Sequence, residues 1–448
     1  MRRLIALVCR FAARLLFRRV EVADRDRLPR GRPVVLVANH FNGFVDPLVI
    51  GAVLGRLPRF VAKAALLSVP LTGFWLRRVG VVFVQRRQDG PTKGNDHAFV
   101  ECHRALAAND TVAIFPEGTT HDRPRLDPIR TGAARIALGA RADGVAGVVV
   151  VPVGLTFPDK SALRSSALVQ FGEPIEVDEI DEVAPDAGDT DHAAVAELTA
   201  RIDHGLRSVS LDFADLGSAL AMEQAAAVAL SAPGRRPPTL EARYDLARSL
   251  GRAPSEAQTR VAGALGRYLT LLSGLHLTDT DVVSPTSPRR LLRSAFGIAV
   301  LVVLLGGVVA ATIVVNAIPA ALVAAVSTFV RTPVTKGTVR VLVGLVAFPA
   351  AWVTAAIVAA DDVGAGLLVV LLAAIGALAA VWLVERAITL TVMLLRWQAQ
   401  LERARSIELA LPARGEVIDA VRAAVPSGEL AATAGSRTVT ADDGGEAS

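Results

Sequence analysis

The segment HFNGFVDP, His40 to Pro47, places a histidine and an aspartate six positions apart. An imidazole that a carboxylate holds in one tautomer can act as a general base toward a hydroxyl group. The same residues also have a purely structural interpretation. An Asp-Pro pair is a typical helix start, in which the Asp46 carboxylate caps free N–H groups and Pro47 takes the first helical position. The segment alone does not decide between a catalytic pair and a helix cap.

The chemistry of such a pair depends on where the nucleophile comes from. No G-x-S-x-G nucleophile elbow occurs in the chain, so a serine nucleophile of the protein has no support. A hydroxyl group of a second substrate can take its place, with His40 as general base and Asp46 orienting the imidazole and stabilising its charge. The triad would then be complete only when that substrate is bound.

The remaining histidines and the cysteines offer no comparable arrangement. His121 and Asp122 are adjacent in a loop, where neighbouring side chains seldom face each other, so we expect them to be loop polar groups. We expect the other histidines to be surface residues without acidic partners: His97, His103, His192, His204 and His276. Cys9 and Cys102 are far apart and lack metal-ligand spacing. We therefore predict no metal site and no cofactor.

Three further motifs follow short apolar runs rich in β-branched residues, which we interpret as buried strands. Arg86 and Arg87 end the run GVVFVQRR, Glu117-Gly118-Thr119 ends AIFPEGT, and VVPVG closes a third run. A helix between the second and third runs is capped by Thr131 and ends at Gly144. In folds built this way, ligands gather beyond the carboxyl ends of the strands, so we expect these motifs to lie close together.

The alternation of strands and helices predicts an α/β domain over residues 20–177, with a central, largely parallel sheet flanked by helices. Residues 1–19 carry arginines on an apolar helical pattern, which is typical of a basic amphipathic helix in a membrane interface. Residues 178–285 show helical patterns separated by Pro-rich breaks, so we expect a helical subdomain there. We interpret residues 286–395 as a membrane region and 396–448 as a cytoplasmic helix followed by a disordered tail.

The membrane region is indicated by three long stretches without charge. These are Ser294–Val330, Val341–Ala360 and Val363–Val384, in a chain of 448 residues whose hydrophobic fraction is 52%. A spanning helix needs about 20 apolar residues. The first stretch would be about 55 Å long as one helix, against a hydrocarbon core of roughly 30 Å. We therefore expect Asn316 and Pro319 to break it into a hairpin.

Two hairpins would satisfy the positive-inside tendency, because the arginine-rich flanks would then all face the cytoplasm. We thus predict an integral membrane protein with its α/β domain and tail on the cytoplasmic face. The net charge of +5 is carried largely by arginines near the apolar segments, which favours anionic membrane lipids as partners. Aromatic residues make up only 5% of the chain and do not alternate with basic ones, so we expect no nucleic acid partner.

The four motifs NHFNGFVD, GVVFVQR, FPEGT and VVPVG stand in the order that is found in the phospholipid/glycerol acyltransferase family. The chain resembles that family, the 1-acylglycerol-3-phosphate acyltransferase-like domain, over residues 20–177. Five residues separate His40 from Asp46, an HX5D motif, where the usual spacing is four. An Asn-Gly turn can absorb the extra residue, because glycine tolerates backbone angles that other residues do not. This longer form, with FVDP and HDRPRLDPIRTGAARIAL, looks most like the glycerol-3-phosphate/dihydroxyacetone-phosphate acyltransferase subgroup.

The resemblance implies transfer of a fatty acyl chain from a thioester, acyl-CoA or acyl carrier protein, to a hydroxyl group of a glycerol phosphate. Glycerol-3-phosphate is the favoured acceptor and lysophosphatidate the alternative. By resemblance, Glu117 helps to hold the glycerol portion, with Gly118 and Thr119 beside it. The acceptor's phosphate requires fixed positive charge, for which Arg86 is the first candidate, since a guanidinium matches phosphate oxygens. Arg130 is the second, because it stands at the start of a helix.

Two functions of other classes stay open from the sequence. In a thioesterase, water would replace the acceptor, and loss of Arg86 would leave turnover unchanged while loss of His40 abolished it. A non-catalytic membrane protein that binds lipids would need neither residue. The presence of all four motif residues, with Asp46 and Glu117 intact, favours an enzyme.

Overall fold

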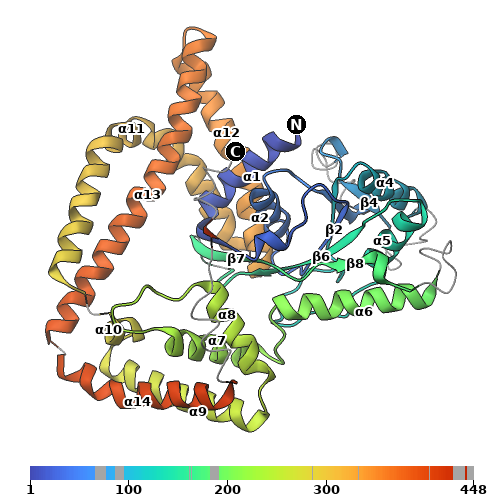
Figure 1. Ribbon diagram of the computed structural model, residues 1–448. Helices are drawn as coiled ribbons and strands as arrows, with labels where there is room; N and C mark the ends of the chain where they lie inside the picture. The colour runs from blue at the N-terminus through green and yellow to red at the C-terminus, as the bar shows by residue number, and fades with distance from the viewer. Residues whose placement is uncertain are drawn as a thin grey trace. The chain divides into compact units, whose positions relative to one another are not determined.

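The computed structural model describes residues 1–65, 77–85, 95–160, 162, 164–181, 191–284, 286–330, 332–402, 404–426 and 439–440 (Figure 1). It divides into two compact units. The first comprises Met1–Ala219, Thr239–Glu241 and Ser436–Ser448, and the second Leu220–Pro238 and Ala242–Gly435. Each unit is described separately below.

A nine-stranded sheet forms the centre of the first unit. Its strands are β1 (Phe17–Ala23), β2 (Val34–Ala38), β3 (Arg59–Lys63), β4 (Val82–Val84), β5 (Thr111–Ile114), β6 (Val149–Thr156), β7 (Ser165–Phe171), β8 (Ile175–Glu176) and β9 (Val439–Thr440). The strand order is β4-β3-β5-β2-β6-β7-β1-β9, and β8 pairs with β6. Neighbours from β4 to β6 are parallel, as are β1 and β7, whereas β6 pairs antiparallel with β7 and β8. The predicted α/β domain with a largely parallel sheet is confirmed.

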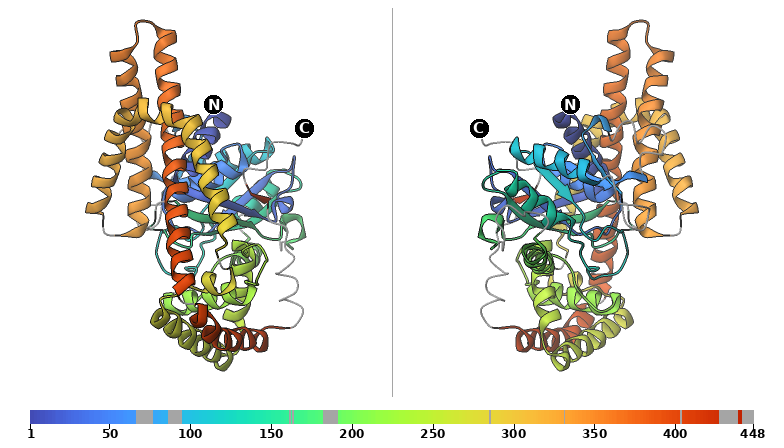
Figure 2. Two further views of the ribbon diagram at one scale, coloured as in Figure 1. Left: turned by 90° about the vertical axis from the view of Figure 1, so that its left-hand side faces the viewer. Right: turned by 90° about the vertical axis from the view of Figure 1, so that its right-hand side faces the viewer.

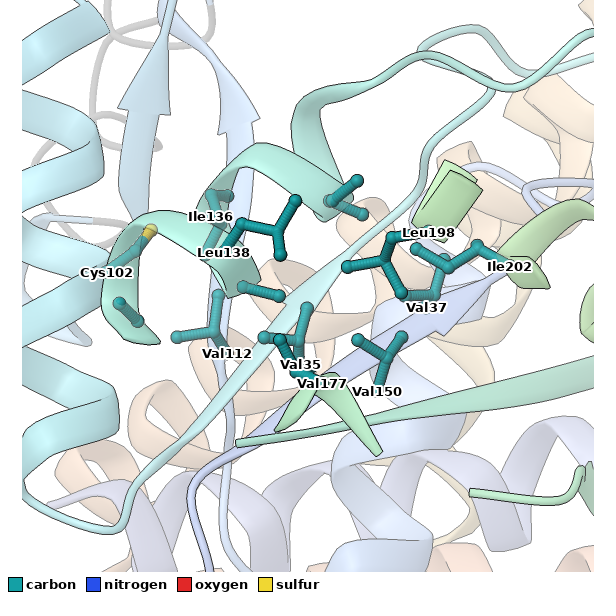
Figure 3. Packing of buried hydrophobic residues seen from close by; sticks show 14 of the residues in the cluster. Val35, Val37, Cys102, Val112, Ile136, Leu138, Val150, Val177, Leu198 and Ile202 are labelled. Carbon is teal, nitrogen blue, oxygen red and sulfur yellow. The ribbon is translucent and has the colours of Figure 1, made fainter. Parts of the chain in front are cut away.

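The central strands are covered on both faces, which explains why they read as continuous apolar runs. Every residue of β2 and β6 is buried. Side chains alternate between the faces of a strand, so Val35 and Val37 point to the same side of β2. Both lie in one core cluster with the helices α4 (Asn95–Ala107), α5 (Gly132–Ala142) and α6 (His192–Val209) (Figure 3). Helix α6 lies within residues 178–285, which the sequence predicts as a helical subdomain, but its leucines belong to this core.

Helix α1 (Arg2–Leu16) is shorter than the predicted helix of residues 1–19. The alternating sequence FRRVEVA forms β1 instead and pairs with β7 from Phe17 onward. Helix α1 packs against α2 (Val45–Leu54). Its first arginine, Arg2, donates to the main-chain carbonyl of Leu57 and to the carboxylate of Asp110, which anchors the helix to the sheet.

Helices make up the described part of the second unit. These are α7 (Leu216–Leu230) and α8 (Leu240–Arg252), which begin in the first unit, then α9 (Ser255–Leu275), α10 (Asp279–Val283), α11 (Pro288–Phe329), α12 (Pro333–Ala359), α13 (Val363–Glu402) and α14 (Ala404–Ala424). Helix α14 packs against α9 and α10. The buried Arg414 of α14 donates to Asp279 of α10 at 2.9 Å, and Tyr268 of α9 donates to the same oxygen at 2.7 Å.

Among the residues that the structure describes, three helices are long and apolar enough to cross a membrane, namely α11, α12 and α13. The expected break at Asn316 and Pro319 is not found, because α11 is one continuous helix with Pro319 inside it. A proline removes one helical hydrogen bond and can bend a helix without ending it, and Figures 1 and 2 show that α11 changes direction along its length. Asn316 does not make a turn either. Its amide donates to the carbonyl of Ala373 in α13 at 3.0 Å and accepts from Trp352 of α12 at 2.9 Å.

Candidate active site

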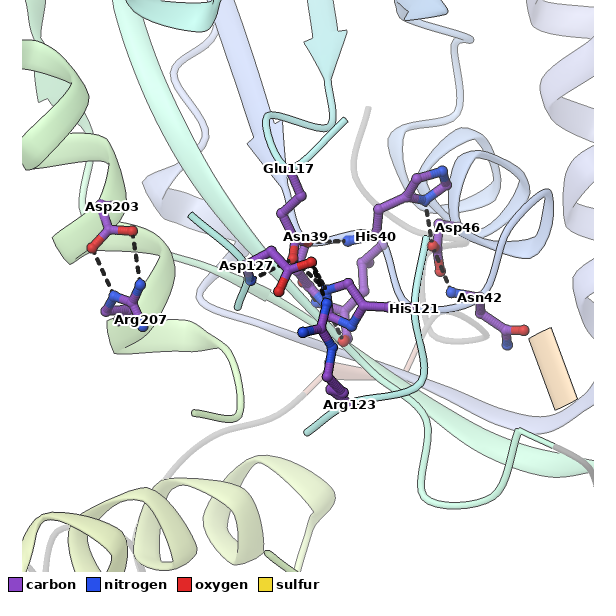
Figure 4. Close-up of polar contacts among 11 residues, drawn as sticks. Asn39, His40, Asn42, Asp46, Glu117, His121, Arg123, Asp127, Asp203 and Arg207 are labelled. Atoms are coloured by element: carbon purple, nitrogen blue, oxygen red, sulfur yellow. Dashed lines mark hydrogen bonds and ion pairs between the residues drawn. The ribbon is translucent and has the colours of Figure 1, made fainter. Parts of the chain in front are cut away.

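His40 and Asp46 lie together beyond the carboxyl end of β2. His40 follows the strand by two residues, and Asp46 stands in the first turn of α2. The Nδ1 atom of His40 is 2.8 Å from Oδ2 of Asp46, whose side chain is fully buried (Figure 4). The main-chain N–H of Asn42 donates to the same carboxylate oxygen at 2.8 Å. The pair therefore has the geometry of an imidazole held in one orientation by a buried acid.

The interpretation of Asp46 as a helix cap is wrong. The N-cap residue of α2 is Phe44, and it makes no side-chain capping bond. The Asp46 carboxylate turns back toward His40 and Asn42, which precede the helix. Gly43 adopts a left-handed backbone conformation with φ of 55°, and the N–H of Val45 closes the turn onto the carbonyl of Asn42. Gly43 thus supplies a left-handed position in the loop between His40 and Asp46, a conformation that glycine adopts without a Cβ penalty.

Glu117 lies beyond the end of β5, the strand that pairs with β2. Its side chain has no exposed surface. One oxygen, Oε1, accepts from the main-chain N–H of His40 at 2.9 Å. The other, Oε2, accepts from the N–H of Asp127 at 2.9 Å and lies 2.7 Å from Nε2 of His121 (Figure 4). The carboxylate therefore connects the loop after β5 to the loop that carries His40.

His121 lies in a loop and does not pair with Asp122, as predicted, but it has an acidic partner that we did not predict. Its side chain is 10% exposed, and its acidic partner is Glu117, four residues earlier, rather than the adjacent Asp122. The four-residue spacing in EGTTH was the available signal, since side chains at that spacing meet whenever the chain curls back by one turn.

Gly118 and Arg130 are brought together by the same loop. Gly118 has a φ of 70°, and a Cβ atom at this position would lie 3.0 Å from Nε of Arg130. The main-chain N–H of Arg130 donates to the carbonyl of Pro116 at 2.9 Å.

The other predicted residues of these motifs have different positions. Thr119 follows Gly118 and is half-buried. Thr131 takes the N-cap position of α5 as predicted, although its side chain makes no capping hydrogen bond. Arg86 and Arg87 lie outside the described residues.

Lys160 is a cation near the site that sequence reasoning missed. It follows β6, and its Nζ atom lies 5.0 Å from the ring centroid of Phe41, the residue after His40. Asp122 is 3.5 Å from the same nitrogen. Burial lowers the pKa of the Lys160 ammonium, and the negative charges of Asp122, Asp46 and Glu117 offset only part of that effect. The contact with Phe41 is within the range of a cation–π interaction, which holds the ammonium beside the loop that carries His40.

One group within the described residues has the composition of a metal site. Glu117, His121 and Asp127 place their possible ligand atoms within 4.8 Å of one another. Protein donors already occupy this space, however. Oε2 of Glu117 accepts from a main-chain N–H, and Oδ2 of Asp127 is 2.5 Å from the guanidinium of Arg123. The arrangement is that of a hydrogen-bonded ion-pair network rather than a cavity for a cation.

The fold and these contacts define a class of site. A histidine–aspartate pair stands at the carboxyl ends of parallel strands, with Glu117 and a lysine beside it, and the chain lacks a serine elbow. Such a site can activate a hydroxyl group that another molecule brings.

The sequence of this domain is similar to those of known acyltransferases. Residues 19–156 match the family model described as Acyltransferase, so this part of the chain is an acyltransferase domain. Glycerol-3-phosphate O-acyltransferase 2 of Saccharomyces cerevisiae is 36% identical over 132 residues, which is 29% of this chain and 18% of that protein. The lyso-ornithine lipid O-acyltransferase of Brucella abortus is 36% identical over 177 residues, 39% of this chain and 61% of that protein. A chloroplastic 1-acyl-sn-glycerol-3-phosphate acyltransferase of Brassica napus is 29% identical over 140 residues, 31% of this chain and 38% of that protein.

The chain thus spans less than two thirds of the length of each of these relatives. The expected resemblance to the acyltransferase family is confirmed for the α/β domain. The helices from α7 to α14 lie beyond the residues that match the family model.

Proposed function

We propose that the protein is a membrane-bound O-acyltransferase of phospholipid biosynthesis. It moves a fatty acyl chain from an acyl thioester to a hydroxyl group of a glycerol phosphate. The observation that carries the proposal is the 2.8 Å contact between His40 Nδ1 and the buried Asp46 carboxylate. This contact leaves Nε2 as the ring nitrogen that accepts a proton from the acceptor hydroxyl.

The reaction follows from that assignment. His40 takes the hydroxyl proton while the acceptor oxygen attacks the thioester carbonyl carbon. Asp46 stabilises the imidazolium that forms. The C–S bond then breaks, and the leaving thiolate takes the proton back from His40. A positioned base of this kind contributes about 10²–10⁴ in rate.

Glycerol-3-phosphate is the proposed acceptor, and lysophosphatidate is the alternative. Both carry a phosphate, and the names of the yeast and Brassica napus relatives contain these two substrates. Arg130 beside Gly118 and Lys160 beside Phe41 are cations of the site that could bind it. Arg86, the first candidate from the sequence, lies outside the described residues and stays a proposed phosphate ligand. The acyl donor is proposed to be acyl-CoA or acyl carrier protein, both of which present the same thioester.

We also propose that the active site faces the cytoplasm. Helix α14 follows the last apolar helix, yet it packs against α9 and α10, which precede the first, through the buried Arg414–Asp279 pair. Both ends of the membrane region would then lie on one side, so the chain would cross an even number of times. Three apolar helices give an even number of crossings if both ends of the bent α11 lie on the same side of the membrane, while α12 and α13 each cross once. The arginines before α11 make that side the cytoplasmic one.

Helix α1 supports a further contact with anionic lipids, as proposed for a basic interfacial helix. Its large apolar side chains Met1, Leu4, Leu7 and Val8 are exposed. Arg3 is exposed as well. An apolar stripe with a basic residue next to it is the surface that binds an anionic membrane interface.

The activity is tested with membranes that contain the protein. They receive a labelled acyl-CoA or acyl carrier protein with glycerol-3-phosphate or with lysophosphatidate. We expect an acylated phospholipid product that disappears in His40→Ala. Release of free fatty acid in the absence of any acceptor would instead assign hydrolysis, and unchanged product formation in His40→Ala would remove the proposed mechanism.

The orientation is tested by labelling introduced cysteines. Burial raises the pKa of Cys9 to about 11 and that of Cys102 to about 12, so the native thiols should react slowly at neutral pH. Asp361→Cys, between α12 and α13, should react with an impermeant reagent from outside intact cells. Ser218→Cys, at the start of α7, should react only after permeabilisation. The opposite pattern would overturn the cytoplasmic assignment.

A further inference from the structure

Both oxygens of the Glu117 carboxylate are hydrogen-bonded to groups of the protein itself. Oε1 accepts from the main-chain N–H of His40, and Oε2 accepts from the N–H of Asp127 and is paired with the ring of His121. The side chain has no exposed surface, so a bound acceptor cannot reach it without displacing one of these partners. This differs from what the family resemblance implies, namely that Glu117 holds the glycerol portion.

The three partners come from two loops that the sheet places side by side. His40 follows β2, while His121 and Asp127 belong to the segment after β5, and β2 and β5 are parallel neighbours. A buried carboxylate is costly unless charge-assisted hydrogen bonds replace its hydration. The bonds that satisfy Glu117 are therefore also the bonds that hold the main chain of His40 against the β5 loop.

We infer that Glu117 and His121 are positioning residues, which fix the main chain of His40 so that its ring stays aligned with Asp46 and with the acceptor. This inference rests on the proposed acyl transfer by His40. Nε2 of His121 donates to Oε2 of Glu117, and the main-chain N–H of His40 donates to Oε1 of the same carboxylate. The position of His121 therefore constrains the main chain of His40 through Glu117. The ring of Phe41 packs 5.1 Å from that of His121 and so supports the same loop from the other side.

Glu117→Gln separates positioning from substrate binding. The amide has one oxygen and one NH2 group, whereas both oxygens of Glu117 accept from main-chain N–H groups. A main-chain N–H can only donate, so the amide must set a donor against a donor in either orientation. A substrate hydroxyl can donate or accept and would tolerate the change. We expect kcat to fall about 10- to 100-fold, as for a slightly misplaced catalytic group, with the KM for the acceptor nearly unchanged.

His121 supplies a second and milder test. His121→Ala removes one donor and should lower kcat in the same way, whereas His121→Gln keeps an N–H donor near the position of Nε2 and should restore most of the activity. His103 is the matched control. Its Nδ1 lies 2.6 Å from Oδ2 of Asp143, a partner that we did not expect, and its side chain is 14% exposed. His103→Ala should leave kcat unchanged, because His103 pairs with Asp143 at the C-terminal end of α5 rather than with Glu117 or Asp46.

A readout that does not depend on turnover is hydrogen–deuterium exchange of the detergent-solubilised protein. In Glu117→Gln and His121→Ala we expect faster exchange in the peptide that contains His40, with unchanged exchange in the buried strand β6. Faster exchange throughout would mean that the variant has unfolded, and His121→Gln then supplies the kinetic comparison. The inference would be wrong if His121→Gln and Glu117→Gln raised the acceptor KM at constant kcat. Glu117 and His121 would then be substrate ligands.

The same set distinguishes failure of this inference from failure of the proposed function. If His40→Ala abolishes transfer while Glu117→Gln and His121→Ala keep kcat, only the positioning role is lost. If His40→Ala keeps activity, the proposed function fails, but the exchange measurement still reports whether Glu117 holds the His40 main chain.

Discussion

The imidazole of His40 is stacked on the ring of Phe115, with the centroids 4.2 Å apart and the planes 18° from parallel. Phe115 immediately follows β5, so the same strand that leads to Glu117 also supplies the aromatic surface against which the His40 ring packs. The stack orients the plane of the imidazole, and the contact with Asp46 determines which ring nitrogen points toward the carboxylate.

Phe115→Leu should therefore lower kcat while the protein stays folded. An aromatic pair contributes about 0.5–1.5 kcal/mol beyond burial, which corresponds to roughly a 2- to 12-fold change in rate if it is lost in the transition state. Steady-state kinetics of acyl transfer measure the effect. Phe99→Leu is the control, because Phe99 of α4 packs against the core and the guanidinium of Arg135 instead. An equal loss in both variants would point to general destabilisation.

Asp46→Asn tests the orientation of the ring by its partner. An amide at this position can donate to Nδ1 and so stabilise the tautomer in which Nε2 carries the hydrogen and cannot act as a base. In a serine triad the equivalent change lowers kcat on the order of 10⁴-fold, and we expect a loss of 10³-fold or more by that precedent. Acceptor-dependent turnover measures it. A loss of less than about tenfold would show that Asp46 acts only in packing.

The sequence is informative about the site wherever the partners are close along the chain. His40 and Asp46 belong to one turn, so their spacing already limits the distance between them. The same spacing also allowed a helix cap, and only the folded loop shows that the carboxylate serves His40 and Asn42. The buried strands were predictable as well, because parallel strands that are covered on both faces become continuous apolar runs.

Contacts between distant segments were not predictable. Lys160 reaches Phe41 only because β6 lies beside β2 in the sheet. His103 and Asp143 are 40 positions apart and meet where α4 packs on α5. Asn316 reads as a helix breaker in isolation, and its role becomes clear only once α12 and α13 supply a donor and an acceptor.

Lys160→Met should weaken binding of the acceptor more than it slows the chemistry. A hydrogen bond to a charged group contributes about 1.5–3 kcal/mol, so loss of the ammonium should raise the acceptor KM by roughly 10- to 150-fold if this group contacts the phosphate. Titration of the wild type gives an independent test. Because the pKa of Lys160 is lowered from its usual value, the ammonium is charged below that pKa and is lost above it. The acceptor KM should therefore rise as the pH increases through that lowered pKa, and this rise should be absent in Lys160→Met.

Asn316→Leu should destabilise the membrane region. The change leaves the indole N–H of Trp352 and the carbonyl of Ala373 without their partner. Interhelical hydrogen bonds in membranes contribute about 0.6 kcal/mol on average and up to about 1.7 kcal/mol. We expect a lower thermal unfolding temperature in detergent, and the loss should be partly reversed when Trp352→Phe removes the orphaned donor as well. Additive losses in the double variant would contradict the proposed contact.

Asp110 makes the anchoring of α1 dependent on pH. Burial alone would raise the pKa of this carboxyl, but the hydrogen bond and charge of Arg2, the N–H of Thr111 and the charge of Arg56 outweigh it, so the net pKa is lowered. A carboxyl whose folded pKa lies below its unfolded value, about 3.9, stabilises the fold above that unfolded value. This stabilisation is lost as the pH falls through the folded pKa. We therefore expect thermal stability to fall more steeply below about pH 4 in the wild type than in Asp110→Asn, which lacks the titrating group. Asp419→Asn, which changes an exposed carboxylate of α14, should keep the wild-type slope. Identical slopes in all three proteins would show that the contact between Arg2 and Asp110 does not hold α1 to the sheet.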